Sequence, residues 1–501
     1  MADATTKCDV LVVGGGINGV GIARDLAGRG VDVLLCEQHD LASHTSSAST
    51  KLIHGGLRYL EYNEFRLVRK ALAEREVLLE AAGHIMWPLR FVLPHEPYLR
   101  PAWMIRAGLF LYDNLARRKR LPPSQVVRLT NHPAGEPLRN ADRVGFVYSD
   151  VWVDDARLVV LNALDARERG ARVYTRTRCA RLERAASGWC ARLEQAGGAG
   201  CEVRAKIVVN AAGPWAADFL KVAAPGVERQ AVRLVKGSHI VVPRVFDHDY
   251  AYIFQNVDRR IVFAIPYEHR YTLIGTTDVD YKGDPGQVAI SIEEIAYLCD
   301  IAGRYFKAAV DPQAIVHTYS GVRPLVADES TDASSVTRDY QFDLDVQGSP
   351  LLSVIGGKIT TYRRLAEEAI ELLRPHLGVI GRPWTHDAPL PGGDFPGRDY
   401  SAYRRSLGVR YPAISPEMLD RWSRAYGMRL ERWLPAALAG GGLGPEIVPG
   451  LHEAELAYLV REEWAVTASD VVWRRSKLGL GMSAGDVQTL DAWLTGYLGR
   501  I

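Results

Sequence analysis

The opening of the chain alternates apolar runs with glycine-marked turns in the order strand, turn, helix, strand. A mostly β-branched run at residues 8–13 leads into the glycine-rich segment 14–19, and residues 17–26 carry apolar side chains at helical spacing. A second apolar run, 31–36, ends at the acidic Glu37. Helical spacing between two strand-like runs predicts a parallel βαβ unit of about thirty residues.

The glycines of this unit have the spacing Gly14-x-Gly16-x-x-Gly19, which is typical of a dinucleotide-binding turn. Gly14 permits the sharp turn, Gly16 lets the backbone approach a pyrophosphate, and Gly19 lets the helix pack on the strand. The pyrophosphate would bind at the positive N-terminal end of the helix. Glu37 would accept hydrogen bonds from ribose hydroxyls. The glycine pattern alone does not separate FAD from NAD.

Further along the chain the pattern changes and then returns. Residues 231–280 form β-rich runs divided by turn residues at short intervals, which favours an antiparallel sheet and therefore a separate domain. Residues 351–374 repeat the order strand, glycine turn, helix. Residues 205–215 are typical of a second nucleotide-contacting strand, with a buried parallel strand as the alternative. These patterns predict a nucleotide-binding domain built from separated segments.

We therefore predict an α/β fold with three domains. They are a discontinuous Rossmann-like FAD-binding domain, an inserted antiparallel β substrate domain and a C-terminal helical cap. The cations Arg474, Arg475 and Lys477 of the cap are expected to form a solvated face. The predicted ranges are 1–80 with 145–230 and 318–387 for the first domain, 81–144 with 231–317 for the second, and 388–501 for the third.

Residues 100–120 predict a helix that is apolar over much of its circumference and that ends in four successive cations, 117–120. An apolar face with aromatic residues and flanking cations suits an anionic membrane surface. A buried core helix with a solvated end is the alternative.

Composition narrows the function classes. The net charge is +2 among 501 residues, so nothing in the overall charge favours nucleic acid. The six cysteines are scattered and predict a reducing cytosol, no disulfide framework and no metal site. The first residues lack the apolar core of a signal peptide, and no apolar run is long enough to span a bilayer.

A polar loop follows the first βαβ unit. It carries Ser and Thr at positions 45–47 and 49–50, followed by His54, Gly55, Gly56 and Arg58. A capped loop before a helix is one interpretation. Glycines, a histidine and an arginine just beyond a nucleotide-binding unit are also typical of backbone pressed against a flat cofactor, and we favour that interpretation.

The second glycine turn, Gly356-Gly357-Lys358, would bring another helix N-terminus to the bound dinucleotide. A flavin that accepts a hydride acquires negative charge near N1 and the C2 oxygen, which a helix dipole and Lys358 would stabilise. Because NAD acquires no such charge, this turn favours FAD over NAD.

Several cations surround the expected redox site and predict an anionic substrate, since arginine suits phosphate or carboxylate. His54 or His239 has the ordinary pKa range to remove an alcohol proton while a hydride leaves carbon. Pairing with surface acids is the alternative for each cation. The cations are Arg58, His239, Arg323, Arg338 and Lys358.

All of these residues except Arg338 lie in strings that resemble the FAD-dependent, respiratory glycerol-3-phosphate dehydrogenases, a family within the D-amino-acid-oxidase-like flavoproteins. The resemblance runs from about residue 8 to the end of the chain. It implies non-covalent FAD, oxidation of sn-glycerol 3-phosphate to dihydroxyacetone phosphate, electron delivery to membrane quinone, and peripheral attachment to the cytoplasmic face of the cell membrane. The strings are STKLIHGGLRYLE, KGSHIVVP, IGTTDVDYKGDP, TYSGVRPL and GGKITTYRRLAE.

The resemblance also implies roles at the matching positions. From the set of cations and the second helix N-terminus, we expect His54, Arg323 and Lys358 to be the catalytic residues. The implied substrate ligands are Arg58, Tyr59, His239, Arg323, Arg338 and Lys358. The expected FAD contacts are Gly14, Gly16, Ile17, Asn18, Gly19, Glu37, Ser46, Ser47, Ser49, Lys51, Leu52, His54, Gly55, Gly213, Pro214, Trp215, Gly356, Gly357, Lys358, Thr360 and Thr361.

Some alternatives stay open. A glycerol-3-phosphate oxidase that uses oxygen, a related amino-acid oxidase, and a flavin-bearing membrane scaffold or sensor without turnover fit the same patterns. The identity of the base, the quinone site and the oligomeric state, with a homodimer as one alternative, stay open as well.

Overall fold

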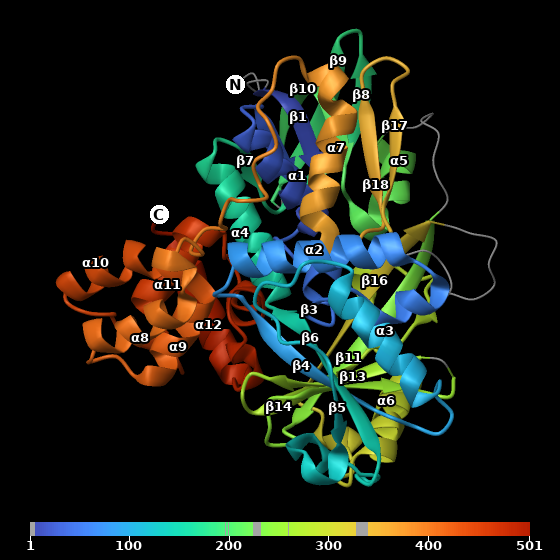
Figure 1. Cartoon of the computed structure of the whole chain (residues 1–501). Coiled ribbons are helices and arrows are strands. Elements are labelled where there is room, and N and C mark those ends of the chain that lie inside the picture. Colours follow the sequence, from blue (N-terminus) through green and yellow to red (C-terminus); the bar gives the residue numbers. More distant parts are fainter. Residues whose placement is uncertain (1–5, 196, 199, 224–231, 259, 327–338) are drawn as a thin grey trace.

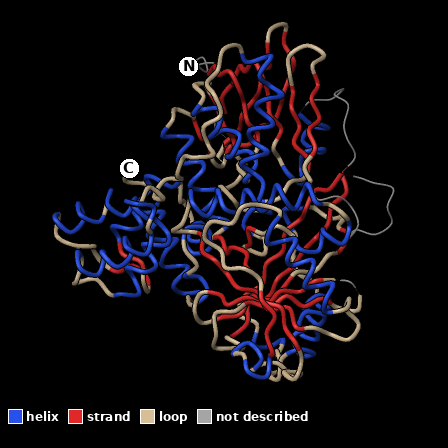
Figure 2. Tube along the Cα trace, viewed as in Figure 1, coloured by secondary structure: helices blue, strands red, loops and turns tan. Residues whose placement is uncertain are grey.

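A computed structural model describes residues 6–195, 197–198, 200–223, 232–258, 260–326 and 339–501. Two large sheets lie one above the other, and a group of helices from the C-terminal third of the chain packs beside their junction (Figures 1 and 2). The predicted α/β fold, with an antiparallel sheet inserted into a discontinuous Rossmann-like domain and a helical C-terminal domain, is confirmed.

The first sheet contains the predicted βαβ unit. Its strands pair in parallel except at one edge, where the last strand is antiparallel. A β-hairpin of β8 (Thr177–Ala185) and β9 (Gly188–Gln195) joins this sheet, because β9 pairs in antiparallel fashion with the strand β10 (Gly200–Asn210) that follows it. In spatial order the strands are β7 (Arg172–Tyr174), β2 (Val33–Cys36), β1 (Thr6–Val13), β10, β18 (Leu351–Ile355) and β17 (Gln341–Asp345).

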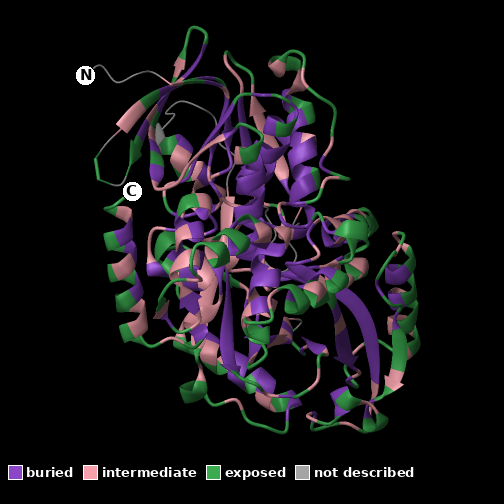
Figure 3. Ribbon diagram, turned by 90° about the vertical axis from the view of Figure 1, so that its left-hand side faces the viewer, coloured by how far each residue is buried: buried purple, intermediate pink, exposed green. Residues whose placement is uncertain are grey.

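The alternation of side chains along β1 explains how both faces of this sheet are covered. Val10 and Val12 pack against the helices α1 (Ile17–Gly28), α4 (Asp155–Glu168) and α7 (Tyr362–Leu377), while Leu11 and Val13 pack against the hairpin side. Helix α5 (Ala216–Ala223) lies by the hairpin. Buried residues concentrate in these layers (Figure 3).

The second sheet is mostly antiparallel. One face packs on α6 (Ile292–Tyr305), and the other lies under α2 (Phe65–Ala81) and α3 (Ala102–Asn114). Its main path is β15 (Val279–Asp280), β11 (Val232–Pro243), β14 (Tyr271–Gly275), β13 (Ile261–Tyr267), β12 (Ala251–Gln255), β4 (Met86–Pro94), β6 (Val144–Val153) and β3 (Leu52–Ile53), with β16 (His317–Val326) on β11 and β5 (Gln125–Arg128) on β6.

Three strands of this sheet lie where we expected the nucleotide-binding domain. Strand β6 pairs with β4 throughout, β3 pairs with β6, and β16 pairs with β11, so none of them belongs to the first sheet. The expected boundaries at 145 and 318 therefore do not coincide with the division between the sheets. The apolar pattern predicts a strand but says nothing about which distant strand becomes its partner.

The C-terminal domain has a hydrophobic core of its own, built around Trp422, Tyr426 and Leu459. Its cations at 474, 475 and 477 were expected to be solvated, and this was wrong: Arg475 is fully buried, and all three pair with acids of the first 160 residues. Its elements are α8 (Tyr400–Arg410), α9 (Pro416–Tyr426), α10 (Leu434–Ala439), β19 (Glu446–Val448), β20 (Leu451–His452), α11 (Glu453–Glu463) and α12 (Ala484–Leu498).

Helix α3 matches the predicted apolar segment but is not a core helix. It buries Leu109 and Tyr112, whereas Trp103 is 70% and Phe110 63% exposed. Throughout the described ranges, every helix is too short or too polar to cross a bilayer.

Candidate active site

A cavity opens at the carboxyl end of the first sheet, between the two sheets. Its walls come from segments far apart in the sequence, which meet because the parallel strands β1, β2, β10 and β18 end at one edge. This is where dinucleotides bind in doubly wound folds. The lining includes Gly14, Gly16, Ile17, Asn18, Glu37, Ser46, Thr177, Gly213, Pro214, Trp215, Gly356 and Gly357.

The glycine turns form a cradle that larger residues would fill. Gly14 has φ +112°, and a Cβ there would lie 2.4 Å from the carbonyl oxygen of Ala211. Gly357 has φ +97°, which also favours glycine. The side-chain amide Nδ2 of Asn18 donates to the carbonyl oxygen of Gly356 at 3.1 Å. The start of α1 and the turn before α7 therefore converge on one cavity, as the sequence predicted.

Glu37 lies at the end of β2 in the wall of this cavity. Its carboxylate accepts hydrogen bonds from the backbone N–H of Gly15 at 2.6 Å and of His39 at 2.8 Å. Burial raises the pKa of Glu37, although these two amides act in the opposite direction. Two carboxylate oxygens have more acceptor sites than two amides occupy, so a ribose diol can still bind there.

A second cavity adjoins the first and shares Ile17, Thr45, Ser46, Pro324 and Gly357 with it. It lies between the start of α7 and the second sheet. This arrangement places a planar group bound at the Gly357 turn directly beside the second cavity. The predicted residues in its lining are Ile17, Ser46, Ser49, Leu52, His54, Arg58, Tyr59, Arg323, Gly357, Lys358 and Thr360.

The cations of the second cavity come from three elements. The Nζ of Lys358 lies 3.7 Å from the ring centre of Tyr59, and Arg58 donates to the hydroxyl of Tyr62 at 2.9 Å. Arg323, on β16, pairs with Asp278. The backbone N–H of His54 donates to the Thr360 hydroxyl at 3.3 Å, which ties the polar loop to the start of α7. Three cations and a histidine therefore face one space large enough for a small anion.

Lys51 and His239, two of the predicted site residues, are buried behind the cavity walls. Lys51 pairs with Asp155 at 2.7 Å, and its charge is neutralised there. His239 stacks on Tyr319 and bonds through Nε2 with the Thr50 hydroxyl at 3.0 Å. Burial, with Arg323 and Lys51 nearby, holds the pKa of His239 well below its usual range, so the ring is neutral.

Four further predicted residues do not line either cavity. Gly19 packs α1 on its strand, since a Cβ there would meet the carbonyl oxygen of Gly14 at 1.9 Å. Gly55 and Thr361 are buried beneath the cavity, and Ser47 hydrogen-bonds within its own loop. Arg338 lies outside the described residues.

Sequence reasoning missed several lining residues. His44 lines the first cavity and contacts Trp215 edge-on at 4.6 Å between ring centres. Burial, assisted by His39 and Arg474, lowers its pKa to about 4. Thr50, Phe263 and Asp278 line the second cavity. Positions 44 and 50 lie within the polar loop that we singled out, and Asp278 lies within one of the quoted strings. Phe263 carries no local signal, because its neighbours in the cavity come from distant segments.

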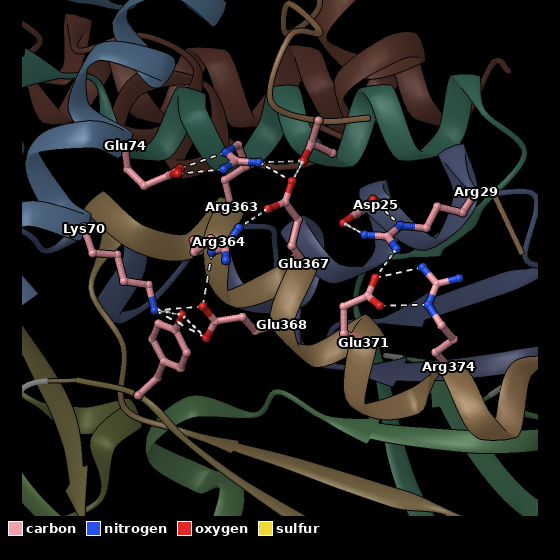
Figure 4. Close-up of polar contacts among 12 residues, drawn as sticks. Asp25, Arg29, Lys70, Glu74, Arg363, Arg364, Glu367, Glu368, Glu371 and Arg374 are labelled. Carbon is pink, nitrogen blue, oxygen red and sulfur yellow. Dashed lines mark hydrogen bonds and ion pairs between the residues drawn. The ribbon is translucent and has the colours of Figure 1, made fainter. Parts of the chain in front are cut away.

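A series of ion pairs fixes α7, whose N-terminus faces the cavities (Figure 4). Arg363 pairs with Glu74 of α2 at 2.6 Å, and Arg29 at the end of α1 pairs with Glu371 at 2.8 Å. Lys70 pairs with Glu368. The helix is thus fixed to both α1 and α2, and its dipole keeps one direction relative to a bound ring.

The site suits an extended dinucleotide and does not resemble a metal centre. Over the part of the chain that the structure describes, no group of three or more His, Cys, Asp or Glu side chains is placed to hold a metal ion. The glycine cradle at Gly14 suits a pyrophosphate, and the turn at Gly357 with Lys358 suits a ring that gains negative charge.

Comparison with known proteins gives the same picture. Residues 9–363 match the family model described as FAD dependent oxidoreductase, and residues 383–493 match the C-terminal domain of alpha-glycerophosphate oxidase. The chain is 54% identical to a glycerol-3-phosphate dehydrogenase of Pseudomonas aeruginosa, over 97% of this chain and 94% of that protein. It is 49% identical to the aerobic glycerol-3-phosphate dehydrogenase of Escherichia coli, over 98% and 97%.

A relative with a different printed substrate is similar to the same degree. The D-erythritol 1-phosphate dehydrogenase of Brucella abortus is 48% identical, over 98% of both chains. Among solved structures, the glycerol-3-phosphate dehydrogenase of Bacillus halodurans complexed with FAD superimposes with a TM-score of 0.76 at 24% identity, over 99% of this chain and 91% of that one.

Proposed function

Because the chain belongs to the FAD-dependent oxidoreductase family, we propose that it is an FAD enzyme that oxidises sn-glycerol 3-phosphate to dihydroxyacetone phosphate. The observation that carries the proposal is the second cavity, where Arg58, Arg323 and Lys358 face one space beside the predicted flavin position. A phosphate monoester is small and doubly charged, and such a set of cations would bind it.

The residues would divide the work as follows. FAD, when bound, supplies the hydride acceptor. Arg58 and Arg323 would hold the phosphate, so that C2 of the substrate faces the ring, and Arg338 stays a predicted third ligand. His54 or Arg323 would assist removal of the C2 hydroxyl proton as the hydride leaves. Lys358 and the N-terminus of α7 would stabilise the negative charge that develops on the ring.

D-Erythritol 1-phosphate is a second candidate substrate, supported by the Brucella abortus relative. It carries the same phosphate on a longer polyol, so the cations alone do not choose between the two. An enzyme that uses oxygen as its acceptor is less favoured, because the relatives of about 50% identity are named dehydrogenases.

The test is the absorbance spectrum of the purified protein without oxygen. We expect a flavin spectrum that glycerol 3-phosphate bleaches within one turnover. D-Erythritol 1-phosphate and an amino acid serve as comparison compounds. Faster bleaching by the erythritol ester would favour the second candidate, and bleaching by the amino acid alone would favour an amino-acid oxidase. A flavin that no compound bleaches would indicate a scaffold or sensor. Peroxide formed on readmission of air would indicate an oxidase.

We infer that the electron acceptor is a membrane quinone. A groove with mostly apolar walls, between α3 and the turn after β12, shares Leu57, Arg58, Tyr62 and Ile261 with the second cavity. A lipid-soluble ring lying there would be separated from the redox site by single side chains.

Gly108 of α3 lines this groove, and a Cβ there would meet nothing within 4 Å. A Gly108→Leu variant should therefore slow oxidation by a short-chain quinone while glycerol 3-phosphate still bleaches the flavin. Ala107→Leu, on the outer side of α3, is the matched control. Equal rates in both variants would remove the groove from the proposal.

We further infer peripheral attachment to the cytoplasmic face of the cell membrane through α3. Trp103 and Phe110 are exposed on this helix, and Arg117 and Arg120 are exposed just beyond it. Arg118 and Lys119 contribute less than expected, since they pair with Asp113 and Glu80. Aromatic side chains with neighbouring cations favour an anionic bilayer surface.

The wild-type protein should sediment with vesicles that contain anionic lipid. A smaller fraction of the Trp103→Ser/Phe110→Ser variant should sediment with the same vesicles. Undiminished sedimentation of the variant would exclude α3 as the attachment site. A homodimer stays a prediction, which light scattering in detergent would test.

A further inference from the structure

The C-terminal domain reaches the nucleotide cavity from behind through one short helix, Asp470–Arg475. We call Asp470, Arg474 and Arg475 the C-terminal clasp. None of the three lines the cavity. Each instead pairs with a residue of a segment that does, so the contact is indirect.

The first arm of the clasp holds Asp40, three residues after Glu37. The Asp40 carboxylate accepts from Nε of Arg474 at 2.6 Å and from Nη1 and Nη2 of Arg475 at 2.6 and 2.8 Å. The side chains of Arg475 and Asp40 are 0% and 2% exposed. A buried bidentate pair of this kind fixes both position and direction.

Asp40 in turn sets the loop that lines the cavity. Its carbonyl oxygen accepts from the Ser43 hydroxyl at 2.7 Å, and Ser43 lies in a lining segment that runs from Ala42 to Ser46. The Ser46 hydroxyl accepts from the backbone N–H of Ile17 at 2.9 Å, at the first turn of α1. These two hydrogen bonds, linked by the backbone of residues 43–46, therefore join the clasp to the helix end that is expected to bind the pyrophosphate.

The second arm holds the opposite wall. Asp470 pairs with Arg176, which lies in the turn between β7 and β8. The backbone N–H of Arg176 donates to the carbonyl oxygen of His39 at 2.8 Å, and that of Thr177 donates to the carbonyl oxygen of Glu37 at 2.7 Å. Thr177 and Glu37 both line the cavity.

We propose that the C-terminal clasp is a positioning device for FAD, which holds the 38–46 loop and the 175–177 turn in the cofactor-binding geometry before FAD binds. Both segments are loops, and ordering them at the moment of binding would cost conformational entropy. With the clasp in place, the loops lose this conformational entropy when the protein folds, so FAD binding does not have to order them. FAD affinity therefore depends on residues more than 400 positions from the glycine turn.

The experiment compares two double variants of buried pairs that join the C-terminal domain to the rest of the chain. Asp40→Asn/Arg475→Met removes the buried bidentate pair of the first arm without leaving a lone buried charge, since Arg474 keeps Asp470 as its partner. Arg157→Met/Glu463→Gln removes another buried pair, which connects α4 to the end of α11 and contacts no cavity loop. The backbone carbonyl of residue 463, which accepts from Nε of Arg475, stays in place in this variant. The readouts are the Kd of FAD for the stripped protein, from quenching of FAD fluorescence, and the melting temperature of the stripped protein.

We expect the Asp40/Arg475 variant to bind FAD about 10- to 100-fold more weakly. The Arg157/Glu463 variant should bind FAD with a Kd within about twofold of the wild-type value, although its melting temperature should be comparable to that of the Asp40/Arg475 variant. Equal Kd values in the two variants, changed or unchanged, would overturn the proposal, because the clasp would then act only on stability.

If the Asp40/Arg475 variant does not fold, Arg176→Gln tests the second arm at a partly exposed side chain. It should weaken FAD binding several-fold. An unchanged Kd for Arg176→Gln would contradict the proposal, and Arg176→Lys should restore part of the affinity. Because the readout is FAD binding, the result does not depend on which phosphate ester is the substrate.

Discussion

Cationic side chains have different surroundings in two regions of the molecule. Arg58, Arg323 and Lys358 line the second cavity, where Arg323 also pairs with Asp278 of the same lining. At the junction of the C-terminal domain, Arg157 and Arg475 are almost fully buried, and each has a carboxylate partner. A buried charge is stable only when it has a partner within the protein, whereas a cation that lines a cavity can also contact a ligand there. The residue type alone therefore does not indicate a binding site.

The largest effect should follow from breaking a junction pair. Arg157→Met leaves Glu463, which is fully buried, without its bidentate partner. We expect the free energy of unfolding to fall by about 3–5 kcal/mol. Chemical denaturation measures it. The matched control is Arg304→Met in the exposed Arg304–Asp300 pair, which should change stability by less than about 0.5 kcal/mol. Similar losses in both variants would contradict the distinction drawn between the regions.

A cavity cation should act on turnover instead. Arg323→Ala removes a charged hydrogen-bond donor to the proposed phosphate, so kcat/KM for glycerol 3-phosphate should fall about 10- to 150-fold. Anaerobic flavin reduction measures it. The melting temperature should change little, since Arg323 is partly exposed. Lys282→Ala, at an exposed cation of the same domain, is the control. An unchanged KM in Arg323→Ala would remove Arg323 from the phosphate site.

His84 lies at the junction of the C-terminal domain with the rest of the chain and is a buried titratable group there. It is fully buried beside Phe395, and neither ring nitrogen has a hydrogen-bond partner among the described residues. Burial, with Arg157 nearby, lowers its pKa to about 3. The unfolded chain therefore binds a proton below about pH 6.5 that the folded chain does not, so stability falls as the pH falls from about 6.5 toward 3.

The His84→Leu variant should lose this part of the pH dependence. We expect the stability difference between pH 8 and pH 5 to shrink by about 2 kcal/mol. Denaturation at the two pH values measures it. His376→Leu, at an exposed histidine, is the control and should leave the difference as in the wild type. An undiminished difference in His84→Leu would show that His84 is protonated in the folded protein.

Much of the cofactor site could be predicted because its signals are local. Gly14, Gly16 and Glu37 lie within one βαβ unit, where spacing alone fixes their geometry. The turn at Gly356 and Gly357 repeats the same local logic. The position of His239 could not be predicted in this way. It lies in the string KGSHIVVP, which resembles the family, but its ring packs on Tyr319 and lines neither cavity. Whether a side chain on β11 faces the cavity depends on the strands beside it.

The sequence by itself determined the strands, the glycine turns and the helix starts, because each depends on backbone conformations that neighbouring residues select. The tertiary structure decided which strands share a sheet, since β6 and β16 pair across long separations. It also decided whether each cation is buried in an ion pair or lines a cavity. Arg475 and Arg323 look alike in the chain, but long-range packing buries one against Asp40 and leaves the other at a cavity wall.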